Sequence, residues 1–286
     1  MLPAMVKKPR IAIVGPGRLG SALSLELQRA GYKVSELIVK RRSRQVAALA
    51  RRLRAQILPQ DNPDIEADVV WFCVPDREIA PAARVLALKR DWKGRAAFHS
   101  SGALPSTELE ELQKRGATIA SVHPLMTFVR GTVPSLDGVT FAVEGDDLAL
   151  RIAKKIIRDL GGDPFEMRVQ NKVAYHTWGA FTSPLLVALL VAAEHVAGAA
   201  GLSVAAARKK MLPILRQTIQ NYGRLGPARA FSGPLVRGDA EIVRKHLNLL
   251  KRIPEAKDVY TALARIAISH LPVQRRAELR KAISEH

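Results

Sequence analysis

A strand that runs directly into three glycines is the feature of this 286-residue chain that most constrains its fold. The stretch IAIVGPGRLG, residues 11–20, begins with four apolar residues and then places Gly15, Gly17 and Gly20 in front of a helical pattern. Glycine contributes no side chain to a core, so its presence here has to serve the geometry of the backbone or something that approaches the backbone closely.

The spacing G-x-G-x-x-G between a strand and a helix has a specific use in proteins. Its first glycine permits a tight turn, its second lets a pyrophosphate approach the backbone, and its third lets the helix pack closely on the strand. The phosphates accept hydrogen bonds from free N–H groups at the start of the helix. A merely structural turn is the alternative, but the flanking strand and helix favour a dinucleotide-binding loop that contains Gly15, Pro16, Gly17, Arg18, Leu19 and Gly20.

Strand and helix patterns alternate as far as residue 168. Apolar runs such as KVSELIVK and ADVVWFCVP are separated by helical patterns, one of which, REIAPAARVLAL, we expect to be interrupted near Pro81. Such alternation requires crossover connections and a parallel sheet with helices on both faces. Only helical periodicity follows. We therefore expect an α/β fold, with a Rossmann-like, mostly parallel sheet in residues 9–168 and an all-α domain in residues 169–286.

The tip of the second predicted strand indicates which dinucleotide binds. Enzymes that use NAD carry an acid about 20 residues after the glycines, where it accepts the ribose hydroxyls. Here the strand ends in VKRRSR, without an acid. Guanidinium and hydroxyl groups hold a 2′-phosphate, whereas a carboxylate would repel it. A solvated basic loop is the alternative, but the position favours NADP as the cofactor, bound by Arg41, Arg42 and Ser43.

Polar residues follow three later strands. CVPD places Val74 and Pro75 at one strand end, together with Asp76; HSSG follows the next strand; and SVHPLMTF carries His123. Ligands bind at the carboxyl ends of the strands in such sheets. For His99 or His123 alone, packing would be the better explanation, but two histidines and two serines at the same edge of the sheet favour a polar pocket. We expect Val74, Pro75 and Ser100 to contact the cofactor, and Ser101 and His123 to act in catalysis.

Composition narrows the class of protein. A single cysteine, Cys73, excludes an intramolecular disulfide and a zinc finger, and no metal site is expected. The N-terminal residues lack the apolar stretch of a signal peptide, so we expect a cytoplasmic protein. The net charge of +19 is concentrated in residues 1–54 and 171–286. Because no nucleic-acid-binding motif accompanies it, an anionic small molecule is a better partner than a specific nucleic acid.

One apolar segment resembles a membrane span by composition. SPLLVALLVAAEHVAGAAGL, residues 183–202, is interrupted by Glu194 and His195, which leaves its apolar run too short to cross a bilayer. We expect a central helix that neighbouring helices bury on all sides, and no membrane association.

Six motifs together carry a family resemblance: IVGPGRLG, VPD, HSSGAL, SVHPLMTF, KVAYH and FSGPLVRGD. With them the chain resembles an uncharacterised bacterial family of two-domain proteins regarded as NADP oxidoreductases. That family belongs to the wider group of phosphogluconate dehydrogenase, hydroxyisobutyrate dehydrogenase, ketopantoate reductase and pyrroline-5-carboxylate reductase. The resemblance implies a helical domain that caps the nicotinamide and forms a homodimer, and a substrate that sits between the domains.

The resemblance also indicates site residues. In the hydroxyacid relatives a serine-glycine turn binds substrate, which corresponds to Ser101 and Gly102 here. Those relatives carry a lysine and an asparagine four residues apart on the first helix of the second domain. The same spacing in this chain gives Lys172 and His176, so the asparagine is absent, and a proline, Pro184, follows on that segment. A lysine and a histidine one helical turn apart can bind a developing alkoxide and transfer a proton.

These observations predict an NADP-dependent oxidoreductase. Hydride would pass between NADP(H) and a small, anionic carbonyl, imine or hydroxy compound, with Lys172 and His176 as the catalytic pair. A protein that binds NADP without turnover, as a sensor or scaffold, is the alternative, because the asparagine is missing and Pro184 is unusual. In GPLVRGD, Arg237 and Asp239 either line the cleft or pair with each other.

Overall fold

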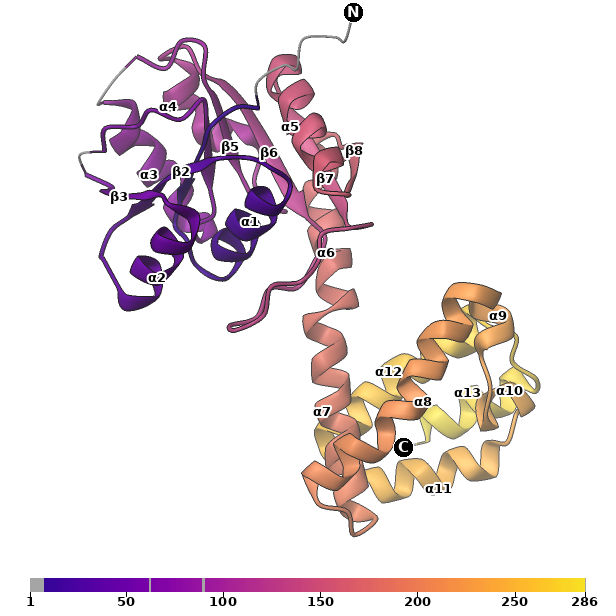
Figure 1. The fold of residues 1–286 in the computed structure, drawn as a ribbon. Helices are drawn as coiled ribbons and strands as arrows, with labels where there is room; N and C mark the ends of the chain where they lie inside the picture. Colours follow the sequence, from indigo (N-terminus) through magenta and orange to yellow (C-terminus); the bar gives the residue numbers. More distant parts are fainter. Residues whose placement is uncertain (1–7, 62, 89–90, 286) are drawn as a thin grey trace, which may run out of the picture. The chain divides into compact units, whose positions relative to one another are not determined.

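The computed structural model describes residues 8–61, 63–88 and 91–285 (Figure 1). The chain forms two compact units, Met1–Ala180 and Phe181–His286. The first is an α/β unit and the second is helical, as expected. Helix α6 (Lys172–Thr182) lies mostly within the first unit. The boundary between the two compact units therefore lies after Ala180, one helix later than the predicted domain boundary at residue 169.

The first unit is built on one eight-stranded sheet in the order β3-β2-β1-β4-β5-β6-β7-β8. In this order, all the strands from β3 through β2, β1, β4 and β5 to β6 are parallel to one another. Strand β7 pairs antiparallel with β6, and β8 is parallel to β7. The predicted Rossmann-like, mostly parallel sheet is confirmed. The strands are β1 (Ile11–Val14), β2 (Val34–Val39), β3 (Gln56–Pro59), β4 (Val69–Phe72), β5 (Ala96–His99), β6 (Thr118–Pro124), β7 (Thr140–Gly145) and β8 (Asp163–Glu166).

Helices connect these strands. They are α1 (Arg18–Arg29), α2 (Arg44–Leu53), α3 (Asp76–Ala87), the 3-10 turn η1 (Ser106–Leu109) with α4 (Glu110–Gln113), α5 (Asp147–Asp159) and the 3-10 turn η2 (Val169–Asn171). The expected interruption near Pro81 is wrong, because α3 continues through it to Ala87. Pro81 lies on the exposed face of the helix, where water can reach the carbonyl that loses its N–H partner.

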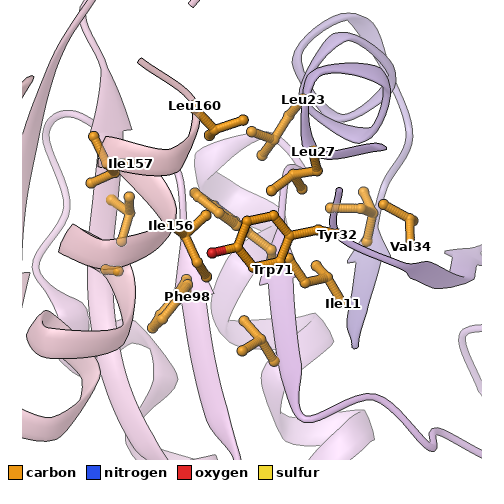
Figure 2. Close-up of a cluster of buried hydrophobic side chains, with 14 of the residues drawn as sticks. Ile11, Leu23, Leu27, Tyr32, Val34, Trp71, Phe98, Ile156, Ile157 and Leu160 are labelled. Carbon is orange, nitrogen blue, oxygen red and sulfur yellow. The ribbon is translucent and has the colours of Figure 1, made fainter. Parts of the chain in front are cut away.

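Alternate residues of the central strands pack on opposite faces of the sheet. Ile11 and Ile13 of β1 join one apolar cluster, whereas Ala12 and Val14 join the other. Figure 2 shows the first cluster, in which Trp71 of β4 lies among side chains of α1 and α5. Its ring meets that of Phe98 on β5 edge to face, with centroids 5.4 Å apart. The two clusters cover both faces of the sheet and leave its strand ends free to form a site.

The second unit has a smaller core. Val243, Leu247, Ala264, Ile268 and Leu279 are buried together where three helices meet. In the GPLVRGD stretch, Arg237 Nε lies 2.9 Å from Asp239 Oδ2, so these two side chains pair with each other. The helices are α7 (Pro184–Ala199), α8 (Val204–Leu225), α9 (Pro227–Ala230), α10 (Pro234–Arg237), α11 (Ala240–Leu250), α12 (Pro254–His270) and α13 (Arg276–Ser284).

The apolar helix α7 is not buried as expected. Among its described residues only Glu194 is buried, and the carboxylate accepts two hydrogen bonds from the guanidinium of Arg208 on α8, at 2.8 and 3.0 Å. Leu185, Val187 and Val191 are exposed. By length and composition alone, Val169–Ala199 is the one stretch of the described chain that could cross a membrane. The prediction that neighbours bury this helix on all sides is therefore wrong for the single chain.

The third glycine of the loop makes a specific prediction about stability. A Cβ at Gly20 would lie 2.6 Å from the carbonyl oxygen of Gly15 and 3.0 Å from Cβ of Cys73, whereas a Cβ at Gly17 would meet nothing closer than 4.0 Å. We expect Gly20→Ala to lower the free energy of unfolding by about 1–3 kcal/mol, even though alanine is favoured in helices, because backbone atoms cannot yield.

Urea denaturation followed by the fluorescence of the buried Trp71 and Trp92 measures this change. Gly17→Ala is the matched control and should alter stability by less than about 0.5 kcal/mol. Equal stability of the two variants would contradict the close packing of α1 on β1 and β4.

Candidate functional site

The glycine loop borders a hollow of about 420 Å³ at the carboxyl ends of β1, β2 and β4. Gly15 has a φ of +80°, a conformation that favours glycine. Gly17 precedes α1 without any capping side chain among the described residues, and the position of its missing Cβ is open. The first N–H groups of α1 and the space beside Gly17 suit a phosphate group.

The basic residues that follow β2 make different contacts. Lys40 forms an ion pair with Glu78 of α3, and both line the hollow together with Arg41. The guanidinium of Arg42 instead lies 3.4 Å from the carbonyl of Ile57, outside this hollow. The hydroxyl of Ser43 accepts a hydrogen bond from the N–H of Val46, at 3.2 Å, and so caps α2. Of the predicted basic residues, Arg41 thus lines the hollow and forms no ion pair with any residue that the structure describes.

The predicted cofactor contacts at the ends of β4 and β5 also separate. Val74 and Pro75 line the hollow. The hydroxyl of Ser100 accepts a hydrogen bond from Nε1 of Trp71 at 2.8 Å. Ser100 therefore fixes the orientation of a core side chain beneath the strand ends.

The hydroxyl of Ser101 is fully engaged within the protein. It donates to Oδ2 of Asp76 at 2.9 Å and accepts from the N–H groups of Ala103 and Leu104 at 3.2 and 2.9 Å. Ser101 is buried, so these bonds organise the turn that follows β5 and join it to the start of α3. The neighbouring Gly102 is buried in this turn and lies beside the histidines described below.

His99 uses both of its ring nitrogens inside the fold. Nδ1 accepts from the N–H of Ser101 at 3.1 Å, and Nε2 lies 2.9 Å from the carbonyl oxygen of Pro105, to which it donates. Burial lowers its pKa to about 4, so the ring is neutral near pH 7. With both nitrogens occupied, His99 supports the turn rather than presenting a group to a ligand.

Lys172 lies at the start of α6 and is 2 % exposed. Its Nζ donates to the hydroxyl of Ser121 on β6 at 2.7 Å, and Ser121 in turn donates to the carbonyl of Ser101 at 3.1 Å. Burial lowers the pKa of Lys172, while the carboxylates of Glu144 and Asp76 oppose that shift. The structure thus brings the predicted lysine to the ends of β5 and β6.

His123, Tyr175 and His176 complete the cluster. Nδ1 of His123 lies 3.0 Å from the hydroxyl of Tyr175, and the rings of His123 and His176 have centroids 6.1 Å apart. Burial, followed by the nearby His176 and Lys172, lowers the pKa of His123 to about 4. Burial raises the pKa of Tyr175 to about 12. A Cβ on Gly102 would come within 3.0 Å of both imidazoles, so only glycine fits there.

Most of the predicted site residues therefore meet at one edge of the sheet. Lys172 and His176 share the first turns of a helix, as predicted, but Lys172 is buried and His176 is exposed. Sequence reasoning missed Ser121 and Tyr175. Ser121 is the first residue of the quoted SVHPLMTF motif, and its side chain points to the opposite face of the strand from that of Val122. Tyr175 is three residues after Lys172, and this spacing places two side chains on one face of a helix.

The cluster offers hydrogen-bond donors, an ammonium group and an exposed imidazole. The described residues contain no group of three or more histidines, cysteines, aspartates and glutamates arranged to hold a metal ion. The arrangement can orient a small polar molecule and exchange a proton with it.

Solved structures share this fold. A proposed NADP oxidoreductase from Bacteroides fragilis superposes with a TM-score of 0.76 at 19% identity, over 90% of this chain and 97% of that one. Protein TM1727 from Thermotoga maritima gives 0.70 at 23% identity, over 96% and 98%. A reductive aminase from Aspergillus terreus, in complex with NADPH and ethyl-5-oxohexanoate, gives 0.63 at 14% identity, over 96% and 99%. At such identities the likeness establishes the fold.

Two domain families account for most of the sequence. The Rossmann-like domain matches residues 3–124, and a domain of unknown function, DUF2520, matches residues 139–267. No match was found among curated proteins. The second match begins at the last strands of the sheet, so it includes α6 and its site residues. The chain therefore combines a Rossmann-like domain with a DUF2520 domain, which matches the two-domain family that its motifs indicate.

Proposed function

We propose that this protein is an NADP-dependent oxidoreductase that acts on a small carbonyl, imine or hydroxy compound in the cytoplasm. The observation that carries the proposal is the placement of an open glycine loop and a cluster of proton-bearing side chains on the same edge of one sheet. Strands β1, β4, β5 and β6 are neighbours, and a spacing of about 4.8 Å puts the ends of β1 and β6 about 14 Å apart. An extended dinucleotide bound at the loop can cross that distance.

The charges at the tip of β2 support NADP over NAD. Glu78 is the carboxylate among the lining residues of the hollow, and the positive charge of its ion-pair partner Lys40 offsets the repulsion that it would exert on a 2′-phosphate. Arg41 remains to bind the phosphate. The names of two similar structures agree with this choice, since one is a proposed NADP oxidoreductase and another contains NADPH.

The chemistry of the cluster supports a small polar substrate. When bound, the nicotinamide supplies or accepts the hydride, and the protein has to orient the substrate and move a proton. A lowered pKa makes the Lys172 ammonium a better proton donor near neutral pH. His176, on the exposed side of the same helix, can exchange protons with water or substrate. The positive residues of the chain favour substrates that carry a carboxylate or phosphate.

Turnover tests this function. We expect the protein to oxidise NADPH in the presence of one or more members of a panel of small 2-oxo acids and cyclic imines, measured by absorbance. Lys172→Met keeps an unbranched side chain that is one atom shorter and removes its charge, and His176→Ala removes the exposed imidazole. Each should lower turnover by about 100-fold or more while calorimetry gives an unchanged affinity for NADP. Tight NADP binding with no turnover on the panel would favour the sensor or scaffold alternative.

Cofactor choice is a separate prediction. We expect the protein to bind NADP at least about tenfold more tightly than NAD, and Arg41→Ala to abolish most of that preference because it removes the phosphate's partner. Arg42→Ala is the matched control, since its guanidinium lies toward Ile57 and should affect NADP less. Isothermal calorimetry of the three proteins with both dinucleotides decides. Equal affinity of the parent protein for NAD and NADP would refute the choice of NADP.

The helical unit supports a second copy of the chain as its partner. Val187 of α7 and Ile214 of α8 are 58% and 68% exposed, a degree of apolar exposure that is unusual for a monomer. A lipid bilayer fits less well, because α8, which pairs with α7 through Arg208 and Glu194, also carries Lys209 and Lys210. Burial of these apolar side chains in a homodimer accounts for the sequence of α7.

Light scattering after gel filtration tests the dimer. We expect a dimer of the parent chain in buffer without detergent, and a monomer of the double variant Val187→Glu, Val191→Glu, because charges cannot be buried in an apolar interface. Leu148→Glu on α5 is the control, since the exposed fraction of that leucine lies between those of Val187 and Val191 but the leucine belongs to the other unit. A monomeric parent chain, or one that requires detergent, would contradict the homodimer.

A further inference from the structure

We propose that Tyr175 is a positioning residue that fixes the tautomer of His123. The hydroxyl oxygen of Tyr175 lies 3.0 Å from Nδ1 of His123, and the two rings meet edge to face with centroids 5.5 Å apart. This contact keeps the proton of the neutral imidazole on Nε2. There it can donate to a carbonyl or carboxylate oxygen of a small substrate, a step that rests on the proposed function.

The direction of this hydrogen bond follows from the surroundings of Tyr175. The side chain is 7% exposed, and its raised pKa, about 12, keeps the phenol protonated at neutral pH. No described residue other than His123 is within hydrogen-bond distance of its hydroxyl. If Nδ1 carried the proton and donated to the phenol oxygen, the phenol proton would be buried without an acceptor, which is unfavourable. Tyr175 therefore donates, and Nδ1 accepts.

A neutral imidazole whose Nδ1 accepts carries its proton on Nε2. No described residue accepts a hydrogen bond from Nε2 of His123, in contrast to His99, whose Nε2 is bound to the carbonyl of Pro105. A Cβ on Gly102 would lie 2.9 Å from this nitrogen. Because residue 102 is glycine, no side chain from that turn covers the Nε2 edge of the ring.

The groups around His123 also keep its ring neutral. Lys172 and His176 of α6 and His99 of β5 each disfavour a positive charge on it, in addition to burial. Among the described residues, no carboxylate is in hydrogen-bond contact with its ring to favour the imidazolium. His123 is thus a neutral N–H donor, and its usefulness depends on which nitrogen holds the proton.

The tautomer can be measured without substrate or cofactor. Nitrogen-15 NMR of the imidazoles at pH 7 distinguishes a protonated ring nitrogen from an unprotonated one, and the signals absent from His123→Gln assign residue 123. We expect a single Nε2–H tautomer in the parent protein and a mixture of both tautomers in Tyr175→Phe, which keeps the ring and removes only the hydroxyl. Tyr222→Phe, an exposed tyrosine of α8, is the control and should leave the spectrum unchanged. An Nδ1–H tautomer in the parent, or an unchanged tautomer in Tyr175→Phe, overturns the proposal.

A double-mutant cycle tests the role of the donor in turnover. Tyr175→Phe should lower kcat by about tenfold in the parent, but by less than about twofold in the His123→Gln background, whose amide keeps an N–H donor without a tautomer to set. Equal losses in both backgrounds would show that Tyr175 acts on the substrate by another route. If NADP fails to bind, the proposed function fails while the NMR result still decides the tautomer; if NADP binds and the tautomer does not respond, only the present proposal fails.

Discussion

A buried ammonium group at the start of α6 joins the first helix of the C-terminal half to the sheet. Removing a charge from water is costly unless polar partners receive it, and Lys172 finds the hydroxyl of Ser121 on β6 with two carboxylates nearby. This bond fixes the register of α6 against the strand ends. About one helical turn later, the hydroxyl of Tyr175 contacts Nδ1 of His123, and the ring of His176 lies beside the ring of His123. The hydrogen bond between Lys172 and Ser121 thus places the side chains of α6 that join His123 in the site.

The same attachment explains what sequence reasoning could predict of the site. The four-residue spacing of Lys172 and His176 correctly gave a shared stretch of helix, but periodicity gives the direction of a side chain and not its depth. Lys172 is buried between α6 and the sheet, whereas His176 is exposed at the surface. Tyr175 was overlooked because an aromatic residue three positions after a lysine is equally typical of a core. Only the hydrogen bond to His123, from a strand 52 residues earlier, separates these possibilities.

Local pattern sufficed for the glycine loop and the parallel strands, because each depends on neighbours in sequence. It failed for β3, a short edge strand with half-exposed residues that ends in Pro59, since nothing in QILP differs from a loop. It also failed for α7. A helix that is apolar all round indicates that its surface is covered, but it does not say by what. Among the described residues of this helix only Glu194 is buried, so the apolar pattern by itself could not distinguish cover by neighbouring helices from cover by a partner.

The two buried histidines show why position alone does not separate a functional side chain from a structural one. His99 and His123 stand at the ends of adjacent strands, and burial lowers the pKa of both to about 4. The difference lies in their partners. His99 has an acceptor for its N–H and a donor for its lone pair, both supplied by the backbone of one turn. Within the described chain, His123 has a hydrogen-bond partner on its Nδ1 side only, and Gly102 lies beside its Nε2. Because buried polar groups are normally satisfied within a fold, this difference in partners, and not position or burial, is what supports assigning His123 rather than His99 to the proposed site.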